Sequence, residues 1–461
     1  MISFNTWQAQ CAVVLMGVAT MGLAAPISAQ ANLIDSATSY STPNSPVSSL
    51  YEEQNIVSSL PRLTLQQALE YALQHNRDLK LGNIAIDTAS AMKTIASAPP
   101  NPMLTLQTAG INPKLGIGAG KPKDKTVDST IRVDQLIERG GKRDLRIENA
   151  GYLETAAHQD WHDVRRQTKQ IVSAAYFDLI AAQHKLRIAN ETRDLFSITQ
   201  AAAEKRKKAG DIAGADAARI RVDALRAEND ARQAASDLLH AQTNLISLLG
   251  LTVSANSVHA VDDWPAQILP EVQDKLDLVI QKRPDVLAAK ARLDAALAAR
   301  KLALAARTRD ISVGVQFEHY PVSASNPQGS GNSFGIGVQI PLFTRYEFQG
   351  EIRVAESAVD AANESLEKTK EAARNELVLL IESAQASKEM TARFQGELLS
   401  AARNSAEAAE FAFKNGALGV MDVLDARRTY RAIEMDAINA QADFAKVQAA
   451  LRISIEEEEK K

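Results

Sequence analysis

Cysteine is nearly absent from this chain, whose 461 residues contain one, Cys11, placed just before an apolar run at residues 12–25. Aromatic residues make up only 5% of the sequence. So few aromatic side chains are poor material for a large compact core. The abundance of Ala, Glu, Lys, Arg and Leu favours long helices instead.

The sequence also lacks an excess of basic residues and any long hydrophobic run after residue 25. The formal net charge is −4, which argues against a nucleic-acid-binding protein because no surplus of cations is available to replace counterions. No apolar run after the first reaches the roughly 18 residues that a membrane helix needs. If the chain spans a membrane, it must therefore do so with strands.

The first 31 residues predict a signal peptide. The apolar run is followed by Ala29-Gln30-Ala31, an A-x-A cleavage pattern, although no Lys or Arg precedes the run. Because Cys11 precedes the run, it is not placed for lipid attachment, and the mature chain would contain no cysteine, as suits an oxidising envelope compartment. We expect a flexible linker at residues 32–62 and a charged tail at 451–461.

The remaining chain is predicted to contain two copies of one plan. The stretch KNGALGVMDVLDARRTY at 414–430 resembles KKAGDIAGADAARIRVD at 207–223: each has a Lys, a Gly, an Asp six residues after that Gly and an Ala- and Arg-rich run. We expect repeats at 63–250 and 271–450, joined by a linker at 251–270. Each has a helix, two strands and a long helical hairpin. The expected strands are 103–111, 129–137, 311–320 and 333–342, and the hairpin tips lie near residues 210 and 416.

The predicted helices are unusually long. Residues 142–208 contain no Pro and one Gly, and at ~1.5 Å per residue they would span on the order of 100 Å. Their apolar residues are spread thinly among alanines, which favours close side-by-side packing of helices.

The predicted strands alternate strictly. In residues 311–318, Ile, Val, Val and Phe alternate with Ser, Gly, Gln and Glu. This pattern is typical of a transmembrane barrel strand, although a half-buried antiparallel sheet is the alternative. Four strands cannot close a membrane barrel, since an open edge in lipid leaves backbone groups unsatisfied. We therefore predict an obligate oligomer. A dimer would give a barrel too narrow for a duct, whereas a trimer would give twelve strands.

The doubled plan, Ile340-Pro341-Leu342-Phe343 after the last strand, and Gly416 followed by residues 422–427 resemble the outer membrane factor (TolC-like) family. The resemblance covers nearly all of the mature chain. The Gly-Gly-Lys-Arg at 140–143 is similar to the heavy-metal cation efflux (CzcC-like) branch. The implied fold is mainly α with a β-barrel contribution, a trimeric efflux duct with four strands and long coiled-coil-like helices per protomer.

The resemblance implies a passive outer-membrane channel of a tripartite efflux system, neither an enzyme nor a cofactor protein. Its implied partners are two further copies, a periplasmic adaptor, an inner-membrane pump of the RND type or similar, and outer-membrane lipid. Its implied cargo is solute, with heavy-metal cations as one class. The alternative is a structural coiled-coil envelope protein, an adaptor or stalk, without a channel.

The family also implies roles for residues at the hairpin tips. The adaptor would contact Gly210, Asp211, Gly416 and Ala417. Asp422 and Asp425 match an acidic pair that narrows the periplasmic aperture, and Asp216 is the counterpart of Asp422 in the first repeat. The alternative for Asp422 is simple stabilisation of a helix N-terminus. Phe413 and Leu418 stand where some members carry Tyr and Arg tethers, so a polar lock of that type is not expected.

Three other motifs resemble catalytic, phosphate-binding or metal sites, and each lacks part of the expected pattern or is a weak match. Residues 331–335 match G-x-S-x-G, but a strand rather than a helix is expected to follow. Residues 116–121 resemble a phosphate loop, but Pro122 replaces the Ser or Thr that would hold Mg²⁺. His158 and His162 are four apart on a helix near Glu154 and Asp163, a weak candidate for a metal site.

Overall fold

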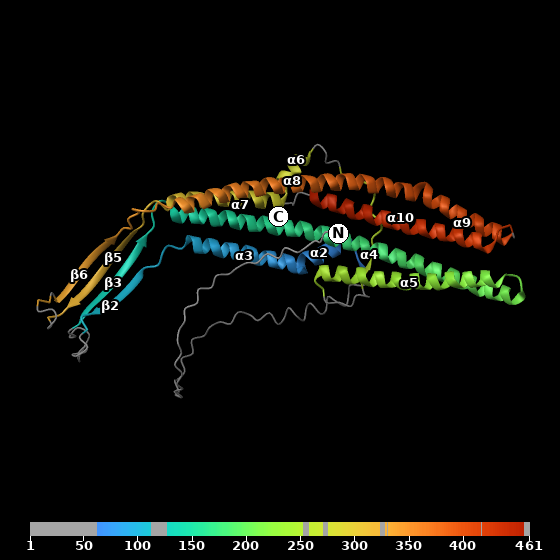
Figure 1. The fold of residues 1–461 in the computed structure, drawn as a ribbon, viewed down its shortest axis with the longest axis horizontal. Coiled ribbons are helices and arrows are strands. Elements are labelled where there is room, and N and C mark those ends of the chain that lie inside the picture. Colours follow the sequence, from blue (N-terminus) through green and yellow to red (C-terminus); the bar gives the residue numbers. More distant parts are fainter. Residues whose placement is uncertain are drawn as a thin grey trace, which may run out of the picture. The chain divides into compact units, whose positions relative to one another are not determined.

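Long helices extend from one end of a four-stranded sheet in this computed structural model (Figure 1). The structure describes residues 62–111, 127–251, 258–270, 275–322, 328–329, 331–415 and 417–455, which belong to one compact unit, 56–461. The predicted signal peptide, nearly all of the predicted N-terminal linker and most of the charged tail lie outside the described residues.

The helices are α2 (Leu65–His75), α3 (Arg77–Ser97), α4 (Lys142–Ala209), α5 (Gly214–Leu249), α6 (Leu276–Lys282), α7 (Pro284–Ala305), α8 (Gln349–Arg393), α9 (Leu399–Lys414) and α10 (Val420–Ile455). The strands of the main sheet are β2 (Met103–Ala109), β3 (Asp128–Ile137), β5 (Ile311–Tyr320) and β6 (Gly331–Gln339), and a small pair is formed by β1 (Arg62–Leu63) and β4 (His259–Ala260).

Two helical rods leave the sheet and run the length of the bundle. The first, α4, has 68 residues, which is about 100 Å at ~1.5 Å per residue. It ends at Gly210, whose φ of 83° is left-handed. The second rod is α8, which continues into α9 through a five-residue π-helix, η5 (Phe394–Leu398). The predicted long helices and four strands are confirmed.

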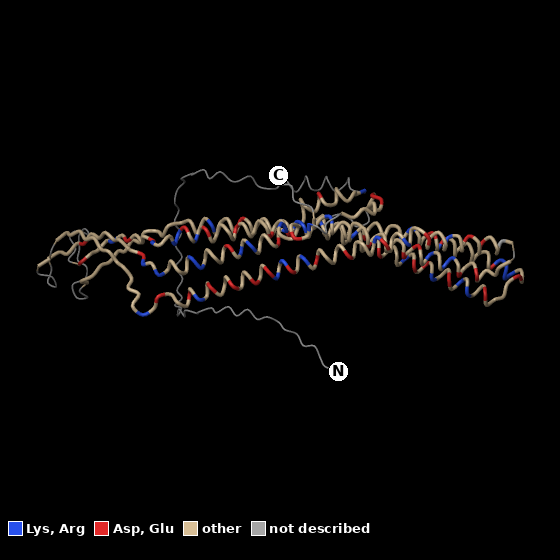
Figure 2. The backbone as a smooth tube through the Cα atoms, turned by 90° about the horizontal axis from the view of Figure 1, so that it is seen from above, with Lys and Arg blue, Asp and Glu red and all other residues tan. Residues whose placement is uncertain are grey.

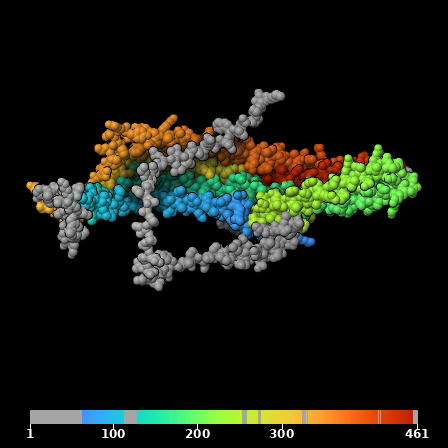
Figure 3. Space-filling view, turned by 60° about the horizontal axis from the view of Figure 1, so that its bottom comes forward, coloured from blue at the N-terminus to red at the C-terminus, as the bar shows by residue number. Residues whose placement is uncertain are grey.

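The bundle is built around α4. Helices α3, α5, α7 and α10 all pack against α4, and α8 packs against α7 and α10. Figure 3 shows the helices of the first half, blue to green, side by side with those of the second half, orange to red. Most buried apolar positions in these seams are alanines, with a bulkier cluster around Tyr176 and Leu179. Small side chains let the helix axes approach closely, as the composition predicts.

The segment between the two halves is tied to the middle of the bundle. Strand β1 pairs in parallel with β4, and the Tyr176 hydroxyl oxygen lies 2.8 Å from both Leu63 O and Asp262 Oδ2, so that its one proton is shared between the two acceptors. Burial and the Asp262 carboxylate raise the pKa of Tyr176 well above its usual range. Gln448 Nε2 donates to Ala266 O and Ile268 O at 2.7 Å. Side chains of α4 and α10 thereby bond to backbone carbonyls of the connecting segment and of β1, and hold both against the bundle.

The sheet is antiparallel in the order β2-β3-β5-β6, so its two edges are β2 and β6. The register aligns Leu106, Ile131, Phe317 and Phe334 across all four strands on one face. Leu106, Ile131 and Phe334 are exposed, Phe334 to 85%, and Phe317 is half-buried beside the Phe334 ring. Figure 2 shows that the charged residues concentrate on the helices, while the strands carry few.

Two strands are shorter than predicted. Strand β6 ends at Gln339 instead of Leu342, because Pro341 has no N–H to extend a ladder. Strand β2 ends at Ala109 instead of Ile111, because Gly110 turns the chain with a left-handed φ of 72°.

The Gly-Gly-Lys-Arg motif joins the first half to the second where β3 meets α4. Gly140 and Gly141 have left-handed φ angles of 75° and 68°. Lys142 Nζ donates to Thr308 O at 2.7 Å and to Asp310 Oδ2 at 2.8 Å, and the Arg139 amide donates to Asp310 Oδ1 at 2.9 Å. The motif therefore fixes how strand β3 sits beside β5.

A second ion pair lies at the same junction between β3 and α4. Arg146 binds Glu138 with both terminal nitrogens, one of them at 2.8 Å. This hydrogen bonding holds the pKa of Glu138 below its usual range. The ion pair therefore links the first turns of α4 to the residue that follows β3.

We expect Gly140→Ala to destabilise this junction. A side chain at positive φ costs about 1–2 kcal/mol, and a Cβ at Gly140 would lie 2.9 Å from the Thr308 side chain. Gly141→Ala is the matched control, because Gly141 also has positive φ but has nothing within 4 Å of its Cβ position. The thermal midpoint in detergent should fall further for Gly140→Ala; equal midpoints would contradict the close contact.

Candidate functional site

Two helical hairpin tips lie together at the end of the bundle away from the sheet (Figure 1). In the first, Gly210 ends α4 and the Asp211 amide donates to Arg206 O at 2.9 Å. In the second, the Ala417 amide donates to Ala412 O at 2.9 Å. Gly210, Asp211 and Ala417 are exposed; Gly416 lies outside the described residues.

A cation–π contact joins the tips. The Arg206 guanidinium of α4 lies 5.8 Å from the centre of the Phe413 ring on α9. Such contacts contribute about 0.5–1 kcal/mol at exposed sites. Phe413 therefore takes part in a contact between hairpins, although of a different kind from a Tyr tether. Leu418 is exposed at the second tip.

The predicted aperture aspartates occupy the beginnings of the two returning helices. Asp422 and Asp425 are both exposed on α10, three residues apart and hence on one side of the helix. Asp422 Oδ2 accepts the Gly419 amide at 3.1 Å. Asp422 thus stabilises the helix start, as the structural alternative predicts, and still presents a carboxylate to solvent. Asp216 is half-buried in the first turn of α5, on the other hairpin.

The structure adds a set of ion pairs that sequence reasoning missed, which we call the arginine latch. Arg428 of α10 binds Asp223 of α5, and Arg431 Nη1 lies 3.0 Å from Asp230 Oδ2. Asp223 is 6% exposed, and the Arg428 guanidinium is its partner in the ion pair. Helices α5 and α10 each pack on α4, and these arginines connect the two hairpins across it.

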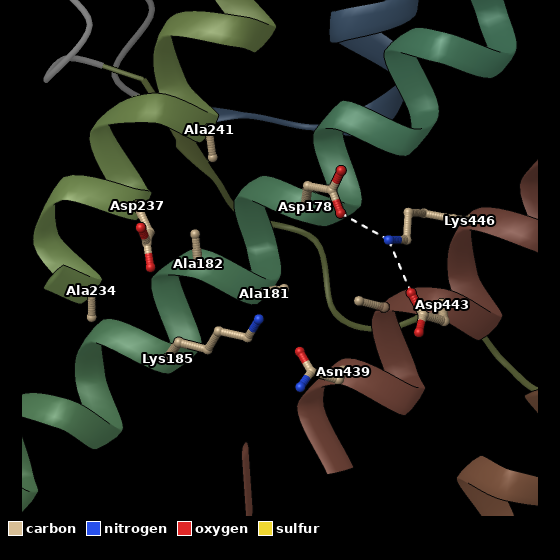
Figure 4. Close-up of a pocket in the computed structure, with 11 residues that line it drawn as sticks. Asp178, Ala181, Ala182, Lys185, Ala234, Asp237, Ala241, Asn439, Asp443 and Lys446 are labelled. Atoms are coloured by element: carbon tan, nitrogen blue, oxygen red, sulfur yellow. Dashed lines mark hydrogen bonds and ion pairs between the residues drawn. The ribbon is translucent and has the colours of Figure 1, made fainter. Parts of the chain in front are cut away.

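An open groove of about 290 Å³ lies between α4, α5 and α10, farther from the hairpin tips than the arginine latch (Figure 4). Alanines such as Ala181 and Ala182 form its floor, and charged side chains form its walls. Lys446 Nζ lies 3.0 Å from both Asp178 and Asp443. Partial burial opposes the charged form, but the two carboxylates raise the pKa of Lys446 above its usual value. The groove holds paired charges and no arrangement of nucleophile and base.

The other predicted motifs have structural roles. Ser333 lies inside β6 and donates to Glu318 at 3.4 Å, so the G-x-S-x-G stretch forms no nucleophile elbow. The carboxylate of Glu154 pairs with Lys93, and Asp163 pairs with Arg166. Around His158 and His162, and throughout the described residues, no group of three or more potential metal ligands is brought together. The phosphate-loop-like stretch at 116–121 lies outside the described residues.

Within the described part of the chain, no helix is both long enough and apolar enough to cross a membrane. The longest helices carry charges along their whole length (Figure 2).

Comparison with known proteins identifies the family. The family described as "Outer membrane efflux protein" matches residues 68–251 and 276–455, the greater part of both halves. The chain belongs to this family.

Individual relatives agree. The cobalt-zinc-cadmium resistance protein CzcC of Cupriavidus metallidurans is 25% identical over 400 residues, covering 85% of this chain and 91% of that protein. The pyoverdine export outer membrane protein OpmQ of Pseudomonas putida is 24% identical over 414 residues, covering 84% of each. The CmeC outer membrane channel of Campylobacter jejuni has the same fold, with a TM-score of 0.71 at 16% identity over 85% of both chains.

The sequence-based resemblance to the outer membrane factor family is confirmed. The protein is an outer-membrane efflux channel, and its family is one of efflux proteins, not one of enzymes. The alternative of a coiled-coil adaptor or stalk without a channel is wrong, because both halves match the efflux channel family.

Proposed function

We propose that three copies of this chain form one continuous duct from the periplasm through the outer membrane, with each copy supplying four strands. The observation that carries this proposal is the pair of open sheet edges, β2 and β6. Unpaired edges are costly in lipid. If β2 of one copy pairs with β6 of the next, the contact is head-to-tail and closes into a ring after a few copies.

The helices beside these edges support the same assembly. Helix α3, next to β2, exposes a row of apolar side chains: Leu81, Ile84, Met92 and Ile95. Helix α8, next to β6, exposes Val354 and Leu379. Large exposed apolar faces usually mark interaction sites. The neighbouring copy in the ring would cover the α3 row with its own α8.

The duct would be passive and would open at the hairpin tips. We place the tips, with Gly210, Asp211, Gly416 and Ala417, against a periplasmic adaptor. An inner-membrane pump of the RND type or similar would supply the energy. The signal peptide would direct export, and the apolar row at Leu106, Ile131, Phe317 and Phe334 would face lipid. In the closed state, the arginine latch would hold the two hairpins of each copy together.

We further propose that the cargo includes divalent heavy-metal cations. Similarity to a cobalt-zinc-cadmium resistance protein over most of both chains supports this class. The exposed Asp422 and Asp425 support it as well, because three copies would gather their carboxylates around the entrance and attract cations. A relative named as a pyoverdine export protein supports a fold that accommodates other cargo, so the pump would select the substrate.

Asp422→Asn combined with Asp425→Asn should reduce cation selectivity and divalent block in planar bilayers. Removing both carboxylates from every copy removes the attraction at the entrance, so we expect block by Zn²⁺ to need roughly tenfold more metal, equivalent to ~1.4 kcal/mol. The matched control is Asp436→Asn, an exposed acid farther along α10. Unchanged Zn²⁺ block in the double variant would contradict the acidic entrance.

A further inference from the structure

The face of the sheet opposite the apolar row carries a connected chain of polar side chains. Arg132 of β3 donates from Nε and Nη2 to the Asp134 carboxylate, at 2.7 and 2.8 Å. Its Nη1 donates to Gln316 Oε1 on β5 at 3.2 Å. Gln316 Nε2 in turn donates to Glu318 Oε1 at 2.6 Å. The chain of contacts thus crosses from one half of the protein to the other.

Glycines lie beneath these hydrogen-bonded polar side chains. The register places Gly314 of β5 opposite Asp134, and Gly337 of β6 beside Gly314. A Cβ at Gly314 would collide with the Asp134 carboxylate, and a Cβ at Gly337 would lie 3.4 Å from Arg132 Nη2. The Arg132–Asp134 pair therefore lies along the surface of the sheet, in space that side chains of β5 and β6 would otherwise fill.

Charge on this face is unevenly divided. Alternation along β3 puts Asp128, Arg132 and Asp134 on it, and alternation along β5 adds Glu318. Among the described residues of the four strands, Arg132 is the single Lys or Arg. The polar face thus contains one cation against three carboxylates, and the one cation is bound in a bidentate pair.

We propose that the Arg132–Asp134 pair sets the charge selectivity of the duct at the level of the sheet. The inference rests on the proposed function, in which the apolar row faces lipid and this polar face lines the passage. Held against Asp134 over the glycines, Arg132 is neutralised and lies flat, and Glu318 and Asp128 leave the passage cation-selective. This selectivity element is separate from the aspartates at the hairpin tips, which lie at the other end of the bundle.

The test is a double-mutant cycle of Arg132 and Asp134. The measured quantity is the reversal potential in a KCl gradient across a planar bilayer. Asp134→Asn releases the Arg132 charge, so the K⁺/Cl⁻ permeability ratio should fall by roughly threefold. Arg132→Gln exposes the Asp134 charge, so the ratio should rise by a similar factor. The double variant removes both charges and should return close to the wild-type ratio. Thr130→Ala, a neutral change on the same face of β3, is the matched control.

The outcomes separate this inference from the function on which it rests. Opposite shifts in the two single variants, cancelling in the double variant, support the inference. Conducting channels whose permeability ratio is unchanged in both single variants overturn it while leaving the duct intact. A wild-type protein that forms no channel overturns the duct and this inference together. Circular dichroism of each variant should match the wild type, and Gly314→Ala, which displaces Asp134, should shift the ratio in the same direction as Asp134→Asn.

Discussion

Asp223→Asn combined with Asp230→Asn should shift the duct toward its open state. The double variant removes the α5 partners of both latch arginines, and Arg428 and Arg431 remain with access to solvent. Each copy loses two pairs, in which the arginines are partly exposed, and pairs with solvent access contribute roughly 0.5 kcal/mol each. Six pairs in three copies then amount to about 3 kcal/mol, which would change the closed-to-open ratio by roughly 100-fold. Single-channel recording should show a higher open probability.

Glu228→Gln is the matched control for the latch. Glu228 lies on the same helix but pairs with Arg232 one turn away, within α5. Its removal changes the charge of the hairpin without cutting a connection between hairpins, so the open probability should stay as in the wild type. If both variants open the duct equally, general charge and not the latch controls the closed state.

The second large effect concerns stability at the middle of the bundle. Arg283 is 3% exposed and binds Asp285 and Glu376, the latter at 2.7 Å. Asp285→Asn with Glu376→Gln would leave this guanidinium buried without a carboxylate. Breaking a buried pair in this way costs about 3–5 kcal/mol, so the thermal midpoint of the purified protein should fall strongly.

Glu367→Gln provides the comparison for that variant. Glu367 lies on the same helix as Glu376, and its pair with Lys370 is exposed, so its loss should cost at most ~1 kcal/mol. The ordering of the two midpoints can be measured by circular dichroism at 222 nm in detergent. A double variant as stable as Glu367→Gln would mean that Arg283 finds another partner or reaches water.

Local periodicity made much of this fold predictable. Alternation in residues 311–318 and the absence of proline from 142–208 are signals contained within one element, and the structure has a strand and a helix there. The ends of β2 and β6 were less predictable, because a single Gly110 or Pro341 decides them. Asp422 and Asp425 could be proposed from the family pattern, and their role at an entrance remains a prediction.

Contacts between distant segments could not be read from the sequence. The arginine latch depends on the register between α10 and α5, two helices that touch α4 and are separated by some two hundred residues. Nothing in the local pattern around Arg428 or Asp223 specifies that register. The same holds for Lys142, whose partners Thr308 and Asp310 belong to the other half. The Gly-Gly-Lys-Arg motif indicates the family from the sequence alone, but its contacts with the other half are visible only in the structure.

The two rods that leave the sheet differ in how easily they bend. Helix α4 is an uninterrupted α-helix from the sheet to its tip, whereas α8 and α9 are joined by the π-helix η5, which contains Gly396. Widened turns and glycines are where helices bend most easily. Force applied at the tips would therefore be absorbed at residues 394–398 of the second rod, while the first stays straight as a lever arm. The first rod would then pass movement at the far end on to the sheet, and the second rod would pass on less of it.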